Sequence, residues 1–361
     1  MPGVYLSYPF CAQKCTYCNF ASGVLPPTLE AEYIEALHAE IARHEWTWTP
    51  ETVYWGGGTP SRLDPAHLER IHSAIPGRPW REATLEAAPG EITRVGAWRQ
   101  AGINRVSLGV QSFVTRELRQ TGRRHTAETV VADVAALRAG GIPEINIDLI
   151  AGLPYQTRES WLESLDWIER LEPPHVSVYM LEVDEDSRLG LEILGQGSRF
   201  GAGHTPSEEL TADLYELAIE RLRTMGIEQY EISNFARKGH ESRHNLKYWR
   251  LEEYAGFGAD AHSLIGGVRY QNVETAQQYV ERGTAVRGEE SAADAAAERF
   301  FVGLRLSEGV VPRTEEWLRY AQPIARFIDA GLLERRGENL RLTPRGVLLS
   351  NEVFQEFLPA S

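Results

Sequence analysis

All three cysteines of this 361-residue chain fall within eight positions, as Cys11, Cys15 and Cys18 of the stretch CAQKCTYCNF. An odd number of thiols is a poor basis for a disulfide framework, and the opening run MPGVYLSYPF carries no secretory signal. A structural zinc site usually closes with four ligands from two separated pairs, so zinc would need a distant histidine. Three thiolates on one short loop suit a [4Fe–4S] cluster whose fourth iron stays open. The spacing favours the cluster, with zinc as the alternative.

A second candidate set consists of glycines, carboxylates and an amide that follow or end apolar runs. Its members are the GGGTP turn at residues 56–60, Glu86, Gln111 and Asp148. Each has a plain structural explanation, because glycine and proline make turns and polar side chains satisfy loop backbone. Together they offer backbone that a ligand can approach closely, and groups that bind an amine or ribose hydroxyls.

The elements that must position these residues follow from hydrophobic periodicity. Short β-rich runs alternate with amphipathic stretches, which is typical of βα units around a parallel sheet. The expected strands are GVYLSY, TVYWGG, ATLEAA, INRVSLGV, EINIDLI and HVSVYML. One expected helix, LEAEYIEALHAEIARHE, repeats apolar residues every four positions, and another, AETVVADVAALRAGG, ends at a double glycine. Six units predict an α/β fold, a partial (β/α)6 TIM-like barrel whose candidate residues share one mouth.

Composition narrows the classes of partner. The formal net charge is −14, which argues against a general affinity for nucleic acid or anionic membranes. No apolar run approaches the length of a membrane span, and clustered reduced thiols fit a cytoplasmic protein. We therefore expect a cytoplasmic protein with no membrane span and no nucleic-acid partner.

The cysteine spacing resembles the signature of the radical S-adenosylmethionine (SAM) superfamily. More narrowly, most of residues 4–264 resembles the oxygen-independent coproporphyrinogen III oxidase family. The runs that carry this resemblance are VYLSYPFCAQKCTYCNF, YWGGGTPS, LEAAPGEI, RVSLGVQSF, NIDLIAGLPYQT, YEISNFA, HNLKYW and GFGADAHS, followed later by GLRLSEGV and LTPRGVLLSNEVF.

The resemblance implies cofactors and site residues. It implies a [4Fe–4S] cluster on the three cysteines, and SAM bound at the open iron through its amino and carboxylate groups. In radical SAM proteins an electron from the reduced cluster splits the sulfonium of SAM, so the cofactor carries the difficult chemistry. The SAM-site positions by motif are Tyr5 and Tyr17 beside the cluster, Gly57, Gly58, Thr59 and Glu86 for the methionine part, and Gln111, Arg123 and Asp148 for SAM, in the oxidase a second SAM molecule.

Two functions compete within this family. One is a heme chaperone that carries heme to acceptor proteins, with respiratory enzymes among the candidates. The other is oxygen-independent coproporphyrinogen III oxidase, also called a dehydrogenase, which decarboxylates two propionates. The oxidase carries a further cysteine where this chain has Phe20, and an extension before the position of Tyr5. These differences favour the chaperone, and whether the chain is also an enzyme is left open.

The HNLKYW stretch adds a third difference, because it resembles the chaperones' His-Asn-x-x-Tyr-Trp motif. Its candidate heme-binding residues are His244, Asn245, Tyr248 and Trp249. An imidazole can ligate heme iron and aromatic faces can stack on a porphyrin, although packing explains each residue alone. His240 and His262 are rival ligands, so no axial ligand is assigned.

We expect three parts along the chain. Residues 1–200 form the radical SAM partial barrel, residues 201–289 form an extension carrying the HNxxYW motif, and residues 290–361 form a smaller winged-helix-like α+β domain. In this last part LLERRGENLRLT reads as a hairpin with GEN at its turn, and the domain caps the barrel. Because winged helices often bind nucleic acid, a radical SAM enzyme acting on nucleic acid is a distant alternative. A heme-linked homodimer is an arrangement that anaerobic sizing would detect.

Overall fold

The protein is built around one curved sheet. The computed structural model describes residues 1–19, 21–282, 290–292 and 294–358, so the comparison made at Phe20 and the expected boundary near residue 290 touch residues outside the described part. Six parallel neighbours form its centre: β1 (Gly3–Tyr8), β2 (Thr52–Gly57), β3 (Glu82–Ala87), β4 (Arg105–Gln111), β5 (Glu144–Ala151) and β6 (His175–Met180). They coincide within two residues at either end with the six expected strands, so the partial (β/α)6 barrel is confirmed.

Short strands extend the sheet at both edges. Beyond β6 lie β8 (Asn234–Ala236) and β7 (Glu228–Gln229), both antiparallel to their neighbours. Beyond β1 lies β9 (Tyr254–Phe257), which is parallel to β1, and then the antiparallel strands β10 (His262–Ile265), β11 (Val268–Gln271) and β12 (Glu290–Ala292). The sheet therefore stays open between β7 and β12 instead of closing into a full barrel.

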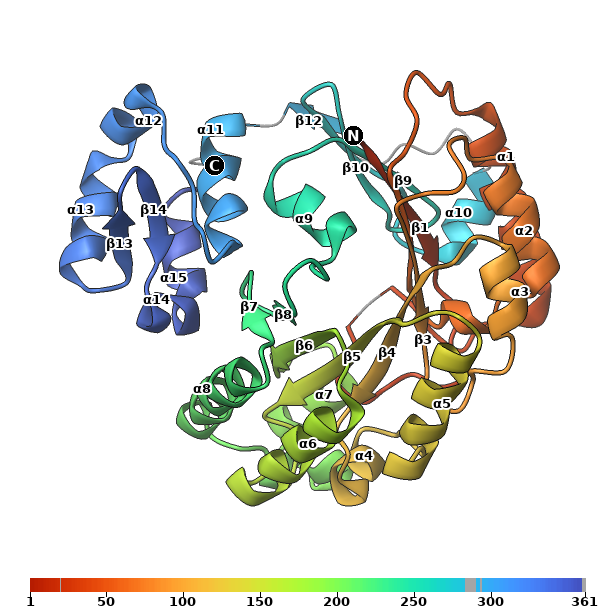
Figure 1. Cartoon of the computed structure of the whole chain (residues 1–361), viewed down its shortest axis with the longest axis horizontal. Coiled ribbons are helices and arrows are strands. Elements are labelled where there is room, and N and C mark those ends of the chain that lie inside the picture. The colour runs from red at the N-terminus through yellow and green to blue at the C-terminus, as the bar shows by residue number, and fades with distance from the viewer. Residues whose placement is uncertain (20, 283–289, 293, 359–361) are drawn as a thin grey trace.

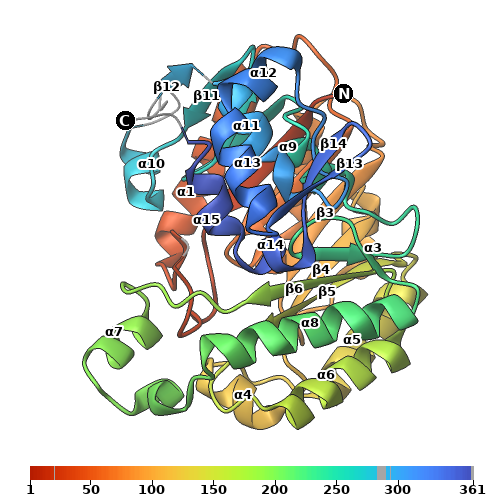
Figure 2. The ribbon, with the colours of Figure 1, turned by 90° about the vertical axis from the view of Figure 1, so that its left-hand side faces the viewer.

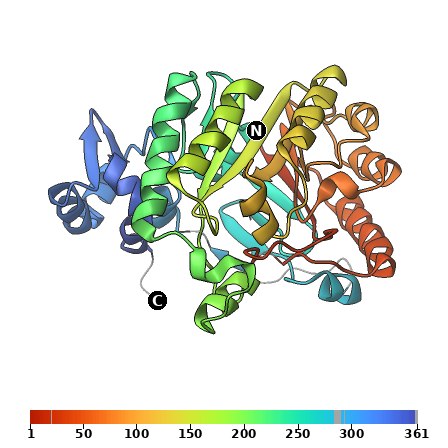
Figure 3. The ribbon, with the colours of Figure 1, turned by 90° about the horizontal axis from the view of Figure 1, so that it is seen from below.

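Helices cover the outer, convex face of the sheet (Figures 1 and 3). They are α1 (Pro27–Arg43), α2 (Pro65–Ser73), α3 (Val95–Gln100), α4 (Thr115–Gln120), α5 (Ala127–Ala139), α6 (Arg158–Leu171) and α8 (Glu208–Thr224), with α7 (Arg188–Leu194) and α10 (Ala276–Arg282) nearer the edges. Leu29, Tyr33, Leu37 and Ile41 of α1 are all buried, which confirms the expected apolar face. No helix in the described ranges is long and apolar enough to cross a membrane.

The inner, concave face is polar. Residues alternate along every central strand, so that one set packs under the helices and the other faces inward. In β6, for example, Val176 and Val178 belong to the apolar core, whereas His175, Ser177 and Tyr179 alternate with them. The same alternation gives the inward set Tyr5 and Ser7, Tyr54 and Gly56, Thr84 and Glu86, Ser107 and Gln111, and Asn146 and Asp148. This face is where a ligand would meet the sheet.

Helix α9 (Arg243–Trp249) lies on the concave side, between the two edges of the sheet (Figure 1). It follows β8 and precedes β9. Its residues contact Gly3, Thr52 and Glu82, which are the first residues of β1, β2 and β3. The helix therefore closes the amino end of the barrel, opposite the end at which the cysteine loop leaves β1.

The C-terminal segment has a core of its own. It contains α11 (Ala295–Phe301), α12 (Thr314–Arg319), α13 (Ala321–Asp329), α14 (Pro344–Leu348), α15 (Ser350–Gln355) and the hairpin β13 (Leu333–Arg336) and β14 (Asn339–Leu342), which Figure 2 shows as one unit. The hairpin is confirmed, with Gly337 and Glu338 at its turn. The segment attaches through backbone hydrogen bonds from Ile232 to Arg305 (3.1 Å) and from Ser307 to Tyr230 (3.0 Å). It therefore lies beside α9.

Gly256 of β9 offers a test of this packing. A Cβ at this position would lie 2.1 Å from the carbonyl oxygen of His262, because the chain after β9 folds back directly over the strand. We expect Gly256→Ala to lower the free energy of unfolding by about 3 kcal/mol, measured by denaturant unfolding. Gly96→Ala is the control, since a Cβ there meets nothing within 4 Å, and it should gain about 0.5 kcal/mol. Equal stability of the two variants would contradict the close approach.

Candidate functional site

The cysteine loop is tied to the sheet through backbone hydrogen bonds. The amide of Cys11 donates to the carbonyl of Gly23 (2.9 Å), and the amide of Thr59 donates to the carbonyl of Phe10 (2.9 Å). The loop also leans on the α4–α5 connection, where Thr16 donates through its amide to Thr121 (3.2 Å). Figure 3 shows this red loop at the end of the sheet near α4. The structure thus brings together two of the segments expected at the mouth, the cysteine loop and the GGGTP turn.

Gly58 is required for this arrangement. A Cβ on Gly58 would lie 2.7–2.8 Å from backbone atoms of Tyr8 and Phe10, and the neighbouring Gly57 has a φ of +105°. Both conditions exclude an ordinary side chain. The GGGTP turn is therefore packed directly on the start of the cysteine loop. A turn exposed on the surface would not require a glycine for such a close contact.

The three thiols lie on one loop at the carboxyl end of β1. All three are half-buried free cysteines. Burial raises the pKa of the Cys11 thiol, hydrogen bonds to Thr59 and Ser22 oppose this rise, and the nearby Cys18 and Cys15 add to it. Within the described residues, no group of three or more His, Cys, Asp or Glu side chains is arranged to hold a metal ion. The donor chemistry of three thiols on one short loop nonetheless fits a thiolate-bound cluster.

Arg123 and Gln111 lie beside the loop with unused polar atoms. Arg123 donates through Nη1 to the carbonyl of Gly109 (2.6 Å) and interacts with Tyr17 and Cys15. Its Nε is buried without a partner among the described residues, as is Oε1 of Gln111. Gln111 also has a left-handed φ of 70°. Orphaned buried polar atoms are costly, so both residues are suited to a polar ligand such as SAM.

Two carboxylates lie close enough on the concave side for Asp148 to affect Glu86. Glu86 accepts a hydrogen bond from the hydroxyl of Tyr54 (3.0 Å), and Asp148 accepts from Ser107 (3.1 Å) and Asn146 (2.7 Å). Burial, then repulsion from Asp148, raises the pKa of Glu86 to about 7. Burial also raises the pKa of Asp148. The pair is therefore suited to a cationic ligand group, which would relieve the repulsion.

Tyr54 and Tyr179, which were not selected from the sequence, line the same face as Tyr5. The rings of Tyr5 and Tyr54 stack with centroids 6.2 Å apart. Tyr179, in β6, is 42 % exposed although it points inward near Asp148 and Glu86, so solvent reaches the concave face. The alternation of polar and apolar residues in each strand was the signal that could have found Tyr54 and Tyr179. These rings provide flat apolar surface beside the carboxylates.

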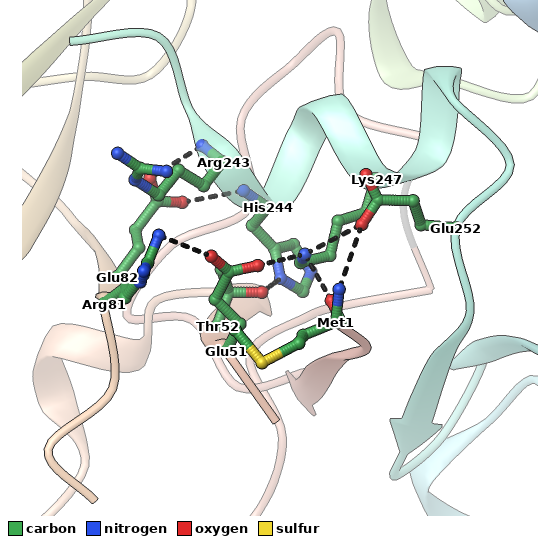
Figure 4. Close-up of polar contacts among 9 residues, drawn as sticks. All are labelled: Met1, Glu51, Thr52, Arg81, Glu82, Arg243, His244, Lys247 and Glu252. Atoms are coloured by element: carbon green, nitrogen blue, oxygen red, sulfur yellow. Dashed lines mark hydrogen bonds and ion pairs between the residues drawn. The ribbon is translucent and has the colours of Figure 1, made fainter. Parts of the chain in front are cut away.

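His244, the first residue of the HNxxYW motif, is fully buried and has both ring nitrogens engaged. Nδ1 lies 2.8 Å from Oγ1 of Thr52 (Figure 4), and Nε2 lies 2.7 Å from the hydroxyl of Tyr248. The ring also stacks on Tyr54, with centroids 5.2 Å apart. Burial lowers the pKa of His244 to about 3, so the imidazole is neutral. In this structure His244 joins α9 to the start of β2.

Two ionised groups anchor α9 on either side of His244. The carboxylate of Glu82 accepts from the amides of Arg243 (2.8 Å) and His244 (3.0 Å) at the start of the helix. Lys247 is buried and donates to the carboxylates of Glu51 (2.9 Å) and Glu252 (3.1 Å; Figure 4). Breaking a buried pair of this kind leaves an uncompensated charge, so α9 is fixed to the amino ends of the strands.

The other motif residues are less enclosed. Tyr248 packs edge-on against Tyr254, with ring centroids 4.6 Å apart. The guanidinium of Arg305 lies 5.2 Å from the ring of Trp249, whose Nε1 is buried without a partner in the described chain. Ser242 caps α9, because its hydroxyl accepts a hydrogen bond from the backbone N–H of Asn245 (3.3 Å). The motif thus presents Tyr248 to the concave face and Trp249 to the C-terminal segment.

Comparison with known proteins gives matches over nearly the whole chain. Residues 5–168 match the family model of the radical SAM superfamily, and residues 291–349 match that of the HemN C-terminal domain. The heme chaperone HemW of Lactococcus lactis is 34% identical, over 98% of this chain and 96% of that protein. HemW of Bacillus subtilis is also 34% identical, over 99% of both chains.

One solved structure shares the whole fold. The coproporphyrinogen III oxidase HemN of Escherichia coli, described as a radical SAM enzyme, superposes with a TM-score of 0.82 over 99% of this chain and 90% of its own. Its sequence identity is 24%, so this likeness establishes the fold alone.

Glu86 gives a pH-dependent prediction. The folded carboxyl keeps its proton up to about pH 7, whereas its usual pKa is 4.5, so the folded state binds more protons between these values. Stability from this group is therefore fully present below pH 4.5 and is lost as the pH rises through 7. In the absence of ligands, Glu86→Gln should gain on the order of 3 kcal/mol at pH 8 and almost nothing near pH 4, measured by chemical unfolding. A gain that does not change with pH would contradict the assignment.

His244 gives a stability prediction. His244→Ala removes a buried ring and leaves Thr52 and Tyr248 without their partner, so we expect a loss of roughly 2–4 kcal/mol in the free energy of unfolding. His204→Ala is the matched control, because His204 is exposed and should change stability by less than about 0.5 kcal/mol. A His244 variant as stable as the control would show that the helix is not anchored by this residue.

Proposed function

We propose that this chain, which belongs to the HemW family within the radical SAM superfamily, is a heme chaperone that binds heme and delivers it to acceptor proteins. The observation that carries the proposal is similarity at 34% identity, over nearly full length, to proteins named heme chaperone HemW. We place this activity in the cytoplasm, where thiols stay reduced.

The cluster and SAM would occupy the mouth at the carboxyl ends of the strands. Cys11, Cys15 and Cys18 would hold a [4Fe–4S] cluster, which when bound supplies an open iron and a source of single electrons. Tyr5 and Tyr17 would flank this position, and the glycines of the GGGTP turn at residues 56–60 would let a ligand approach the backbone.

The polar residues of the mouth would orient SAM. Glu86 and Asp148 provide the negative charge that an ammonium or sulfonium group requires, and their mutual repulsion falls when a cation binds. Gln111 and Arg123 bring buried polar atoms that have no protein partner in the described residues, which suits the carboxylate and ribose of the ligand. The charges of the site are thus complementary to a zwitterionic ligand.

Heme would bind on the concave face between the mouth and α9. Tyr5, Tyr54 and Tyr248 supply aromatic surface there, and solvent reaches this face. His244 would act by holding Tyr248, because its nitrogens are already engaged. Asn245 and Trp249 complete the motif at the side nearest the C-terminal segment.

These proposed sites assign a different role to each of the three parts of the chain. Residues 1–200 would bind the cluster and SAM, residues 201–289 would add the heme-facing surface, and residues 290–361 would cover the side of the barrel beside α9. The described contacts of Ile232 with Arg305 and of Tyr230 with Ser307 support this arrangement.

The experiment compares the anaerobically reconstituted protein with a Cys11→Ala/Cys15→Ala/Cys18→Ala variant. The parent protein should hold about four iron and four sulfide per chain and the variant almost none, by chemical analysis. In an absorbance titration the parent should bind about one heme per chain, and it should not oxidise coproporphyrinogen III. Oxidation of coproporphyrinogen III without saturable heme binding would contradict the chaperone and favour the oxidase. Zinc in place of iron would contradict the cluster.

A further inference from the structure

A row of inward-facing residues crosses the sheet toward its β9 edge. Tyr54 pairs with Tyr5, and Tyr5 pairs with Gly256, so glycine replaces a side chain at this point of the row. Directly opposed residues present their side chains to the same face of a sheet. The next strand, β10, therefore meets a gap in the aromatic surface.

The chain at His262 fills that gap with its backbone. A Cβ on Gly256 would lie 2.1 Å from the carbonyl oxygen of His262 and 2.9 Å from its carbonyl carbon. The turn between β9 and β10 is made by Gly258 and Asp260, whose φ angles are +94° and +58°. Gly256 therefore lets the turn bring His262 over the concave face.

Strand register fixes the side of the sheet to which His262 belongs. Leu264 is opposite Tyr254, whose ring contacts Tyr248 of α9 on the concave side. His262, two residues before Leu264, lies on the same face, and it pairs with Gln271 of β11. Gln271 in turn donates to Asp260 (3.1 Å), and Asp260 lines one small cavity together with Tyr5. His262 thus belongs to the neighbourhood of Tyr5.

The His262 imidazole is exposed, and it has no hydrogen bond or ion pair with any described residue. The two rival histidines differ in this respect. His244 is buried between Thr52 and Tyr248, and His240 places Nδ1 within 3.0 Å of the carboxylate of Glu144. Among the three, His262 is the imidazole that can coordinate a metal without first breaking a contact.

We propose that His262 is the axial ligand through which this chain holds heme iron, with Tyr5 beside the ring and His244 acting only as a positioning residue for α9. The inference rests on the proposed function, since it concerns the same heme site. Neutral imidazole is a common protein ligand of heme iron. A ligand on an edge hairpin, beside an open face, would also be accessible to an acceptor protein that takes the heme.

The test is an anaerobic heme titration of the full-length reconstituted protein, followed by absorbance. His262→Ala should change the Soret and visible bands and weaken affinity roughly tenfold or more, and free imidazole should restore the parent spectrum. His262→Gln, which keeps a side chain of similar size, should show the same spectral loss. His240→Ala is the matched control and should leave spectrum and affinity unchanged.

Unchanged bands and affinity in both His262 variants would overturn the ligand assignment while leaving heme binding intact. A spectral change in His240→Ala that imidazole restores, with His262→Ala unaffected, would transfer the ligand to His240. No saturable heme binding by the parent protein would instead overturn the proposed function, and the ligand assignment with it.

Discussion

The curved sheet has one face covered by helices and one face left open, and this asymmetry determines where every polar side chain of the barrel can lie. Strands that were buried on both faces would be apolar throughout. Here Val176 and Val178 enter the helix-covered core, while Ser177 and Tyr179 face inward. The polar set forms one connected surface, so carboxylates, amides and tyrosines from six different strands meet without any long loop to bring them together.

The two ends of this surface are held by different kinds of contact. At the carboxyl end, the cysteine loop is held by backbone hydrogen bonds and by the close approach of Gly58. At the amino end, α9 is fixed by Glu82 and by the buried Lys247. The position of Tyr248 is therefore set by contacts at the amino end of the strands, away from the cysteine loop.

The strands could be predicted closely because each is a short run bounded by glycine, proline or a polar turn, as in TVYWGG and EINIDLI. Once the strands were placed, the residues at the mouth could be predicted as well, because the carboxyl ends of parallel strands lie at the same edge of the sheet. The position of α9 could not be predicted, because it depends on contacts between His244 and Thr52, 192 residues apart. Tyr54 and Tyr179 were missed for another reason: tyrosine reads as apolar in a strand, and only comparison of all six alternations shows that these two face inward.

A series of hydrogen bonds links the C-terminal segment to Asp148 at the mouth. Burial holds the pKa of His175 well below its usual value, so the ring is neutral. Nδ1 then donates to Oδ1 of Asn146 (2.7 Å), whose amide donates to Asp148 (2.7 Å), and Nε2 accepts from the hydroxyl of Tyr230 (2.9 Å). The carbonyl of Tyr230 accepts from Ser307 of the C-terminal segment. The hydrogen bonds thus run from Tyr230 through His175 and Asn146 to the carboxylate of Asp148. Because Tyr230 is bonded to the C-terminal segment, the position of these side chains depends on that segment. A movement of that segment away from Tyr230 would therefore weaken the hydrogen bonds that hold Asp148 in place.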